Sequence, residues 1–426
     1  MEMLRQILSR ENLHQAYKHV KRNRGSSGVD GMSLDHLKAH LANNWSALQD
    51  DISEGRYLPQ AILGVYIPKD NGKKRLLGIP TVVDRLLQQA VSQVLTPIFE
   101  EGFQQHSYGF RPYRNAHQAI KQAQQNINEG YQYIVDIDLQ NFFDEVEHDL
   151  LLQLIYRKVK CEKTLRLIRK WLKSPILLNG TLAKRKKGVP QGSPLSPLLS
   201  NIVLNELDKE LEKRGHRYVR YADDFSIYLQ SKRAARRVGN SITLFLKEKL
   251  RLPVNRDKSG IRRPVKFKLL GYGFVPTYKK GEKGKYQLIA NSKAWKRFKQ
   301  SIKSITRKTT PMSFEERVRR LNQVNRGWVN YFRYAGLSTK LKKMDEWIRN
   351  RLRYCIWHFW KKPERKRKNL IRLGIAPNLA YAWSRTRMGG WAVAQSPMLR
   401  TTITLPRLER KGFVSLLSYY KQVSDA

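Results

Sequence analysis

Apolar residues along the chain follow two different periods, and the change of period divides the sequence into expected elements. Runs of aromatic and β-branched residues between turn residues predict strands; they occupy residues 65–69, 74–80, 134–139 and 217–229. Apolar residues at helical spacing predict helices; they occupy residues 4–21, 86–94, 116–128 and 198–213. From about Asn291 onward helical patterns dominate, as in residues 295–305 and 315–332. The pattern predicts an α+β part followed by a helical part.

The run at 217–229 is interrupted by an acidic pair, Asp223-Asp224. Two strand-like runs around a short break predict a hairpin with both carboxylates at its tip. Adjacent carboxylates repel each other, and a solvated turn more often uses Gly or Asn. A bound Mg²⁺ would offset this repulsion, because it prefers carboxylate oxygens. A structural acidic turn is the alternative, and a metal site needs a third carboxylate from another strand.

A third carboxylate is present in the apolar strand at 134–139, where Asp136 and Asp138 project on one face. Burying unpaired carboxylates on such a strand is costly. Either a cation or Lys and Arg partners must therefore satisfy them. On the residues alone, metal binding and salt bridging both stay open.

The charge balance indicates which class of partner the protein binds. The 426 residues include 82 Lys and Arg against 35 Asp and Glu, a net charge of +47. Such a charge argues for a polyanionic partner, namely nucleic acid. No long apolar stretch or signal peptide is visible, so we expect a cytoplasmic protein without a membrane partner. Two distant cysteines, Cys161 and Cys355, form neither a disulfide framework nor a zinc cluster.

Three further segments carry candidate binding residues. The glycine-rich loop from Gly25 to Gly31 either approaches a phosphate backbone or is a flexible surface loop. The basic hairpin at 65–80 and the helix after it either grip a nucleotide triphosphate or carry solvated charge; their basic candidates are Lys69, Arg75 and Arg85. Gln191 lies in a Gly- and Pro-rich loop before a helix, where it can hydrogen-bond a sugar or base.

The order of four short motifs then becomes diagnostic. Asp138 precedes Phe143 by five residues, followed by Pro-Gln-Gly at 190–192, Tyr-Ala-Asp-Asp at 221–224 and Leu-Gly-Tyr at 270–272. This ordered set resembles the reverse transcriptases, and closely resembles the maturase proteins encoded by bacterial group II introns. The resemblance runs from Met1 to the C-terminal end, and the segments 25–31 and 107–112 narrow it to the intron-encoded type.

The resemblance implies a two-metal nucleotidyl transfer site. Asp138, Asp223 and Asp224 would hold two Mg²⁺ ions, and Asp136 would have a supporting role. Phe143 would be the steric gate that rejects a 2′-hydroxyl. The triphosphate would contact Lys69, Arg75 and Arg85, with Gln191 against the nucleotide. Lys258 resembles the lysine that protonates pyrophosphate.

The resemblance also implies a right-hand polymerase. Fingers and palm would occupy residues 1–290, a helical thumb (the maturase X domain) 291–365, and a small basic DNA-binding domain 366–426. The expected nucleic-acid contacts combine glycines, cations and the segment that resembles the primer grip: Gly25, Gly28, Arg111, Arg114, Leu270, Gly271, Tyr272, Lys361, Lys362, Arg365, Lys366, Arg367 and Lys368.

The expected function is RNA-directed DNA polymerisation, in which intron RNA is copied from a DNA primer or target with dNTPs. Preferential binding would also stabilise the native intron RNA and assist splicing. The alternatives are a splicing factor with a decayed polymerase and a domesticated reverse transcriptase in defence or repair. No Cys pair follows Cys355, so we do not expect an endonuclease domain of the family's longer members.

Overall fold

The computed structural model describes residues 2–68, 72, 74–278 and 280–424. Two compact units divide between Arg263 and Pro264, whereas the sequence placed the end of the polymerase part at residue 290. The strands between 264 and 290 thus belong with the helical unit that follows. The functional limits 1–290, 291–365 and 366–426 stay a prediction.

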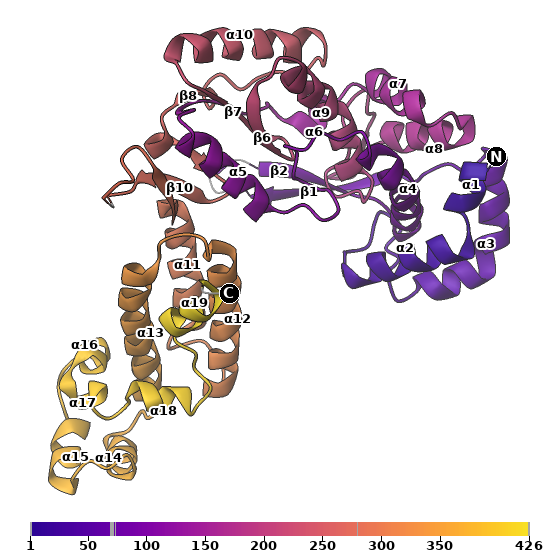
Figure 1. Cartoon of the computed structure of the whole chain (residues 1–426). Helices are drawn as coiled ribbons and strands as arrows, with labels where there is room; N and C mark the ends of the chain where they lie inside the picture. Colours follow the sequence, from indigo (N-terminus) through magenta and orange to yellow (C-terminus); the bar gives the residue numbers. More distant parts are fainter. Residues whose placement is uncertain (1, 69–71, 73, 279, 425–426) are drawn as a thin grey trace. The chain divides into compact units, whose positions relative to one another are not determined.

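An antiparallel sheet forms the centre of the N-terminal unit. Its strand order is β6-β7-β3-β8, with bounds Arg217–Tyr221 (β6), Asp224–Leu229 (β7), Tyr133–Ile137 (β3) and Gly260–Arg262 (β8). Helix α10 (Lys232–Glu248) packs on β3, β7 and β8, and it lies above this sheet in Figure 1. Its Gly239 faces Val135 of β3, where a Cβ would lie 3.3 Å from the valine side chain. The hairpin and the buried strand that the sequence predicts are both present.

A second sheet of the same unit has the order β2-β1-β4-β5. Its strands are β1 (Ile62–Pro68), β2 (Lys74–Ile79), β4 (Ile176–Leu178) and β5 (Thr181–Ala183). The predicted antiparallel hairpin of β1 and β2 is confirmed, and β4 adds to it in parallel. Most of the expected turn, residues 70–73, lies outside the described residues.

The helices of the N-terminal unit cover these sheets. The single helix expected at 4–21 is wrong: the Ser9 side chain accepts a hydrogen bond from the Asn12 N–H and so starts a new helix. The helices of this unit before α10 are α1 (Glu2–Ile7), α2 (Arg10–Arg22), α3 (Leu37–Ser53), α4 (Val82–Glu100), α5 (Ala116–Asn128), α6 (Phe142–Glu145), α7 (His148–Lys158), α8 (Glu162–Lys173) and α9 (Ser196–Lys213).

The C-terminal unit begins with the 3₁₀ turn η1 (Pro264–Lys266) and a small antiparallel sheet of order β11-β10-β9. These strands are β9 (Lys268–Leu269), β10 (Tyr272–Pro276) and β11 (Tyr286–Ala290). Helices follow: α11 (Ser292–Ile305), α12 (Phe314–Phe332), α13 (Ser338–Phe359), α14 (Pro363–Arg372), α15 (Pro377–Ser384), α16 (Gly390–Gln395), α17 (Pro397–Arg400), α18 (Leu405–Glu409) and α19 (Leu416–Ser424).

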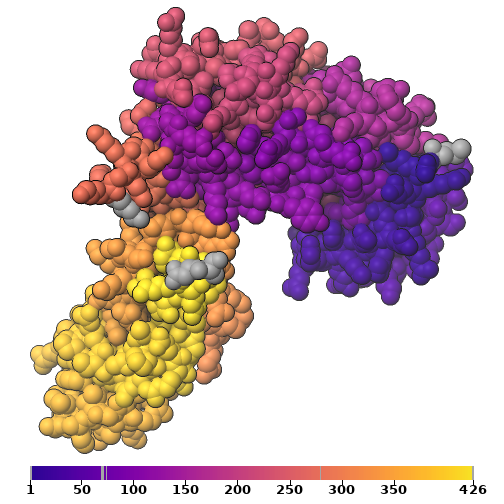
Figure 2. Space-filling view, in the orientation of Figure 1, coloured from indigo at the N-terminus to yellow at the C-terminus, as the bar shows by residue number. Residues whose placement is uncertain are grey.

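The end of the chain folds back onto α12 and α13. The buried Asp345 carboxylate of α13 accepts hydrogen bonds from the N–H groups of Leu416 and Leu417 and thereby caps α19. The Tyr420 hydroxyl donates to the Ala335 carbonyl at 2.8 Å. Figure 2 shows these C-terminal residues in yellow, continuous with the orange helices of the same unit.

The fold class is therefore the expected mixture of helices and antiparallel sheets. Across the described part of the chain, no helix is long and apolar enough to cross a membrane.

Candidate active site

The acidic hairpin has a two-residue turn. Tyr221 pairs with Asp224, which leaves Ala222 and Asp223 as the turn residues. Ala222 has a φ of +56°, a conformation in which Gly or Asn is the usual residue. Asp223 therefore lies in the turn itself, and Asp224 is the first residue of β7.

Strand β3 brings the third carboxylate to this turn. Ile137, the last residue of β3, pairs with Phe225 of β7 in an antiparallel register. One residue further on each strand are Asp138 and Asp224, and opposed neighbours in such a ladder lie side by side. The register thus places Asp138 next to the acidic turn, as the sequence predicts for a metal site.

The carboxylates perturb one another. Burial first, and then Asp223 and Asp138, raise the pKa of Asp224 to about 6, although its side chain keeps access to solvent. Burial also raises the pKa of Asp223; Asp138 adds to this effect, and Arg75 opposes it. The cluster therefore carries negative charge that a nearby cation would stabilise.

Asp136 in β3 and Asp138 just after it have different partners. Asp136 accepts a hydrogen bond from Arg262 Nε at 2.7 Å. Asp138 lies 3.3 Å from the Nζ of Lys258, whose side chain is 61% exposed. Asp136 thus pairs with Arg262, and Asp138 pairs with the exposed ammonium of the predicted catalytic lysine.

The loop that leads into β8 fixes the backbone at Asp138. The Asp138 N–H donates to Ser259 Oγ at 3.0 Å, and the Asn255 N–H donates to the Asp138 carbonyl at 2.8 Å. These bonds join the segment Asn255–Ser259 to the end of β3. They hold Lys258 beside Asp138 through the backbone as well as through charge.

Two predicted nucleotide contacts are brought together by the second sheet. Arg75 Nε on β2 donates a hydrogen bond to Gln191 Oε1, and the Gly78 N–H donates to the Gln191 carbonyl at 2.8 Å. Gly192 has a φ of +118°, and a Cβ there would lie 2.7 Å from the Gly78 oxygen. Because Arg75 also opposes the rise that burial causes in the pKa of Asp223, this pair and the acidic turn share one electrostatic environment.

The backbone and ring of Phe143 are held in place beside the loop that contains Gln191. Its carbonyl accepts a hydrogen bond from the Val189 N–H at 2.7 Å, and its ring packs edge-on against Phe142 with centroids 5.2 Å apart. Gly188 has a φ of +87°, and a Cβ there would approach the Phe143 oxygen to 2.9 Å. The glycine therefore allows the close approach that fixes this phenylalanine.

Arg85 holds the glycine-rich loop from inside the protein. The Arg85 side chain is buried and donates to the Ser26 carbonyl at 2.6 Å. Gly25 lies against this guanidinium, and a Cβ at Gly28 would lie 2.7 Å from the Cα of Thr81. Because these contacts occupy the guanidinium, Arg85 is not among the proposed triphosphate contacts. Lys69, another predicted contact, lies outside the described residues.

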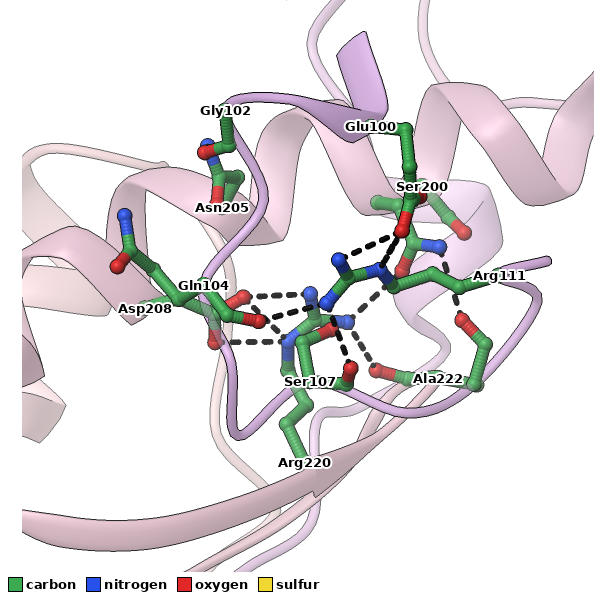
Figure 3. A network of polar contacts seen from close by, with 12 residues as sticks. Glu100, Gly102, Gln104, Ser107, Arg111, Ser200, Asn205, Asp208, Arg220 and Ala222 are labelled. Atoms are coloured by element: carbon green, nitrogen blue, oxygen red, sulfur yellow. Dashed lines mark hydrogen bonds and ion pairs between the residues drawn. The ribbon is translucent and has the colours of Figure 1, made fainter. Parts of the chain in front are cut away.

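Arg111 is an internal anchor (Figure 3). Its side chain is only 4% exposed and donates to the Glu100 carboxylate and to the carbonyls of Gln104 and Ser107. A guanidinium so engaged is not available to a phosphate backbone. Arg114, in contrast, is partly exposed.

The sequence analysis missed Arg220, which supports the acidic turn directly. Its fully buried guanidinium pairs with Asp208 at 2.6 Å and donates to Asn201 Oδ1 and to the Ala222 carbonyl, each at 2.9 Å (Figure 3). A Cβ at Gly109 would meet the backbone at Ala222, so the loop that contains Gly109 packs against the acidic turn. The available signal was a second arginine, after Arg217, in a strand of aromatic and β-branched residues.

The remaining predicted contacts lie in the C-terminal unit. Leu270 and Gly271 both have positive φ, the Tyr272 hydroxyl donates to the Tyr331 carbonyl, and the Leu270 carbonyl accepts from the Tyr331 hydroxyl at 2.7 Å. Leu270 and Gly271 border a pocket of about 610 Å³ between α11 and α12.

The basic run starts at the N-terminal end of α14. Four of its cations are exposed: Lys361, Lys362, Arg365 and Lys368. Lys366 lies over the Trp357 ring with its Nζ 4.4 Å from the centroid, and Arg367 pairs with Glu364 at 3.7 Å. The run therefore presents mainly unburied positive charge.

The donor chemistry at the turn fits a divalent cation. Carboxylate oxygens are the ligands that hard cations prefer. Burial first, and then neighbouring carboxylates, raise the pKa values of Asp223 and Asp224, and a bound cation would offset both effects. Within the described residues, no three His, Cys, Asp or Glu side chains are already gathered closely enough to hold a metal ion.

Comparison with known proteins identifies the family of the chain. Residues 67–274 match the family "Reverse transcriptase (RNA-dependent DNA polymerase)", and residues 295–374 match "Group II intron, maturase-specific domain". The protein YkfC of Escherichia coli is 32% identical over 61% of this chain and 78% of its own length. The group II intron-encoded protein LtrA of Lactococcus lactis is 31% identical over 63% of this chain and 56% of LtrA.

A solved "Partial Cas6-RT-Cas1--Cas2 complex" contains a chain that is 26% identical, with a TM-score of 0.38 over 58% of this chain and 42% of that chain. The first family match covers the acidic hairpin, and the second covers residues 295–374 of the C-terminal unit. From the matches to the polymerase and maturase families and the identity to their relatives, we conclude that the chain belongs to the reverse transcriptases and carries the maturase-specific domain of group II intron proteins.

Proposed function

We propose that Asp138, Asp223 and Asp224 are the catalytic centre of RNA-directed DNA synthesis by this chain and bind two Mg²⁺ ions. The observation that carries this proposal is the pairing of Ile137 with Phe225, the residues adjoining Asp138 and Asp224, together with the raised pKa of Asp224. Reverse transcriptases use divalent metal ions. When bound, such ions activate the primer 3′-hydroxyl and stabilise the leaving pyrophosphate.

The side chains around this centre orient the incoming nucleotide. Arg75 contacts the triphosphate, and Gln191, its hydrogen-bond partner, lies against the sugar or base. Phe143 excludes a 2′-hydroxyl because its backbone is held by the Val189 bond and cannot retreat. Lys258, next to Asp138, donates a proton to the leaving pyrophosphate.

A second activity follows from the maturase-specific domain. We propose that the chain binds intron RNA and, by binding the native fold preferentially, assists its splicing. Its partners are then intron RNA, a DNA primer or target, and dNTPs. LtrA is a group II intron-encoded protein, and this chain spans 56% of its length.

Primer extension on an RNA template with Mg²⁺ and dNTPs tests the catalytic proposal. Asp223→Asn and Asp224→Asn keep side-chain shape but remove the charge that holds a cation, so each variant should lose extension while RNA binding persists. Asp257→Asn, an exposed aspartate beside Lys258, is the matched control and should retain activity. Extension by either hairpin variant at the wild-type rate would overturn the assignment.

A further inference from the structure

Two aromatic residues of the loop after α4 adopt a backbone conformation that aromatic residues avoid. Phe110 and Tyr113 both have a φ of +59°, in the left-handed region where Cβ and the backbone crowd. Their side chains are nevertheless exposed, Phe110 by 51% and Tyr113 by 97%. Packing against the protein therefore does not explain why aromatic residues occupy these positions.

The local turn makes Tyr113 the clearer case. The Arg114 N–H donates to the Arg111 carbonyl at 3.4 Å, which closes a turn with Pro112 second and Tyr113 third. Proline second and a positive φ third are the features of a type II turn, in which Gly or Asn is the usual third residue. A tyrosine here adds strain without adding contacts in the folded chain, as is typical of residues retained for binding.

The loop is also held rigidly. Arg111, which lies between Phe110 and Tyr113 in the sequence, is bound to Glu100 and to two backbone carbonyls, as Figure 3 shows. Gly109 packs against the backbone at Ala222, and its carbonyl accepts a hydrogen bond from Asn201 at 2.9 Å. The aromatic rings are thus presented from a fixed support that adjoins the acidic turn.

The charge of the chain and the position of this loop indicate which class of ligand the two aromatic rings bind. A protein with a net charge of +47 attracts polynucleotides, and the partly exposed Arg114 adds a cation at this loop. Exposed aromatic faces offer unpaired bases a stacking surface that a paired duplex cannot use. We propose that Phe110 and Tyr113 form a stacking platform for unpaired nucleobases of a single-stranded polynucleotide.

The stacking proposal rests on the proposed function in one respect only: the bound single-stranded polynucleotide lies beside the acidic turn. The strand is either RNA template or single-stranded DNA, which offer the same stacking chemistry. Stacking releases no condensed counterions, so removing a ring lowers affinity without changing its dependence on salt. Removing either ring should weaken single-strand binding about tenfold.

The variants Phe110→Gly and Tyr113→Gly separate binding from folding. Glycine is suited to a positive φ, so each variant should keep or raise the melting temperature while binding falls. Tyr113→Phe keeps the ring and should bind like the wild type. Tyr156→Ala is the control, because Tyr156 is a 52% exposed aromatic of α7 in the same unit and should bind unchanged.

The measurement is fluorescence anisotropy of the full chain with labelled oligouridylate, oligothymidylate of equal length, and a blunt duplex, over a series of salt concentrations. Weaker binding to either single strand, with unchanged salt slope and unchanged duplex affinity, supports the platform; the strand affected identifies RNA or DNA. Unchanged affinity for both single strands, or an equal loss for the duplex, would overturn it.

The same binding series in an Asp224→Asn background keeps this result apart from the catalytic proposal. If that variant still extends primers, the catalytic assignment fails, while loss of single-strand binding on removing a ring still supports the platform. If extension is lost but the rings have no effect on binding, the platform alone fails.

Discussion

Arg220 and Asp208 form a completely buried ion pair, with Nη2 and Oδ2 separated by 2.6 Å. The same guanidinium donates to the carbonyl of Ala222, the residue before Asp223. The pair thus joins α9 to the turn that carries the proposed catalytic carboxylates. Because a buried ion pair owes much of its value to geometry, we assign it a positioning role.

Arg220→Met should destabilise the protein by about 3–5 kcal/mol, because it leaves the buried Asp208 charge without a partner. The double variant Arg220→Met/Asp208→Leu removes both charges and should recover most of the free energy of unfolding. It still lacks the bond to Ala222, so kcat should stay low with KM for dNTP little changed. Denaturant unfolding and steady-state primer extension measure the two effects, and full recovery of kcat in the double variant would contradict the role.

Asp136 and Asp138 should behave differently. Asp138→Asn should abolish primer extension, whereas Asp136→Asn should retain most of it, because Asp136 is occupied by Arg262. This salt bridge is about one-third exposed, so its loss should cost less than about 1 kcal/mol. Single-turnover extension and thermal unfolding of both variants check this; equal inactivation would bring Asp136 into the metal site.

Phe143→Ala should admit ribonucleotides, since it opens the space in which a 2′-hydroxyl would otherwise clash. The ratio of kcat/KM for dNTP to that for the matching rNTP measures the change. Phe142→Leu is the control, because the neighbouring ring is in the core and its change should leave the ratio intact. An unaltered ratio in Phe143→Ala would remove this residue from the gate.

Arg75→Ala and Gln191→Ala should each raise KM for dNTP about tenfold, since hydrogen bonds to charged groups are among the stronger ones. Lys74→Ala tests the role of charge alone. Successive side chains of a strand point to opposite faces. The Lys74→Ala variant therefore removes an equal charge from the opposite face of β2. Equal effects of Lys74→Ala and Arg75→Ala on KM would show that only the charge of the hairpin matters.

Lys366→Gln together with Arg367→Gln should weaken binding to RNA and DNA and reduce the dependence of affinity on salt. Each lost phosphate contact should lower the slope of log K against log salt concentration by about one. The control pair Lys247→Gln and Lys249→Gln lies at the exposed end of α10 and should leave the slope unchanged. A wild-type slope in the α14 variant would count against a role in backbone binding.

The sequence by itself determined those elements whose apolar period is unambiguous. The helix at Ala116–Asn128 and the hairpin around Asp223 occur where expected, because helical and strand periods are local properties of the chain. The exception was the break at Ser9, where one side-chain hydrogen bond interrupts a helical pattern that continues on both sides.

Only the tertiary structure decided the partners of charged and aromatic residues. Arg111 and Arg220 are both arginines beside a motif, yet Glu100 holds one away from any ligand while Asp208 uses the other to support the turn. Asp136 and Asp138 are likewise only two positions apart, yet Arg262 pairs with one and Lys258 with the other. The physical reason is that a charged side chain is paired with groups that are distant in the sequence. The local period of apolar residues does not encode which of these groups the fold brings next to it.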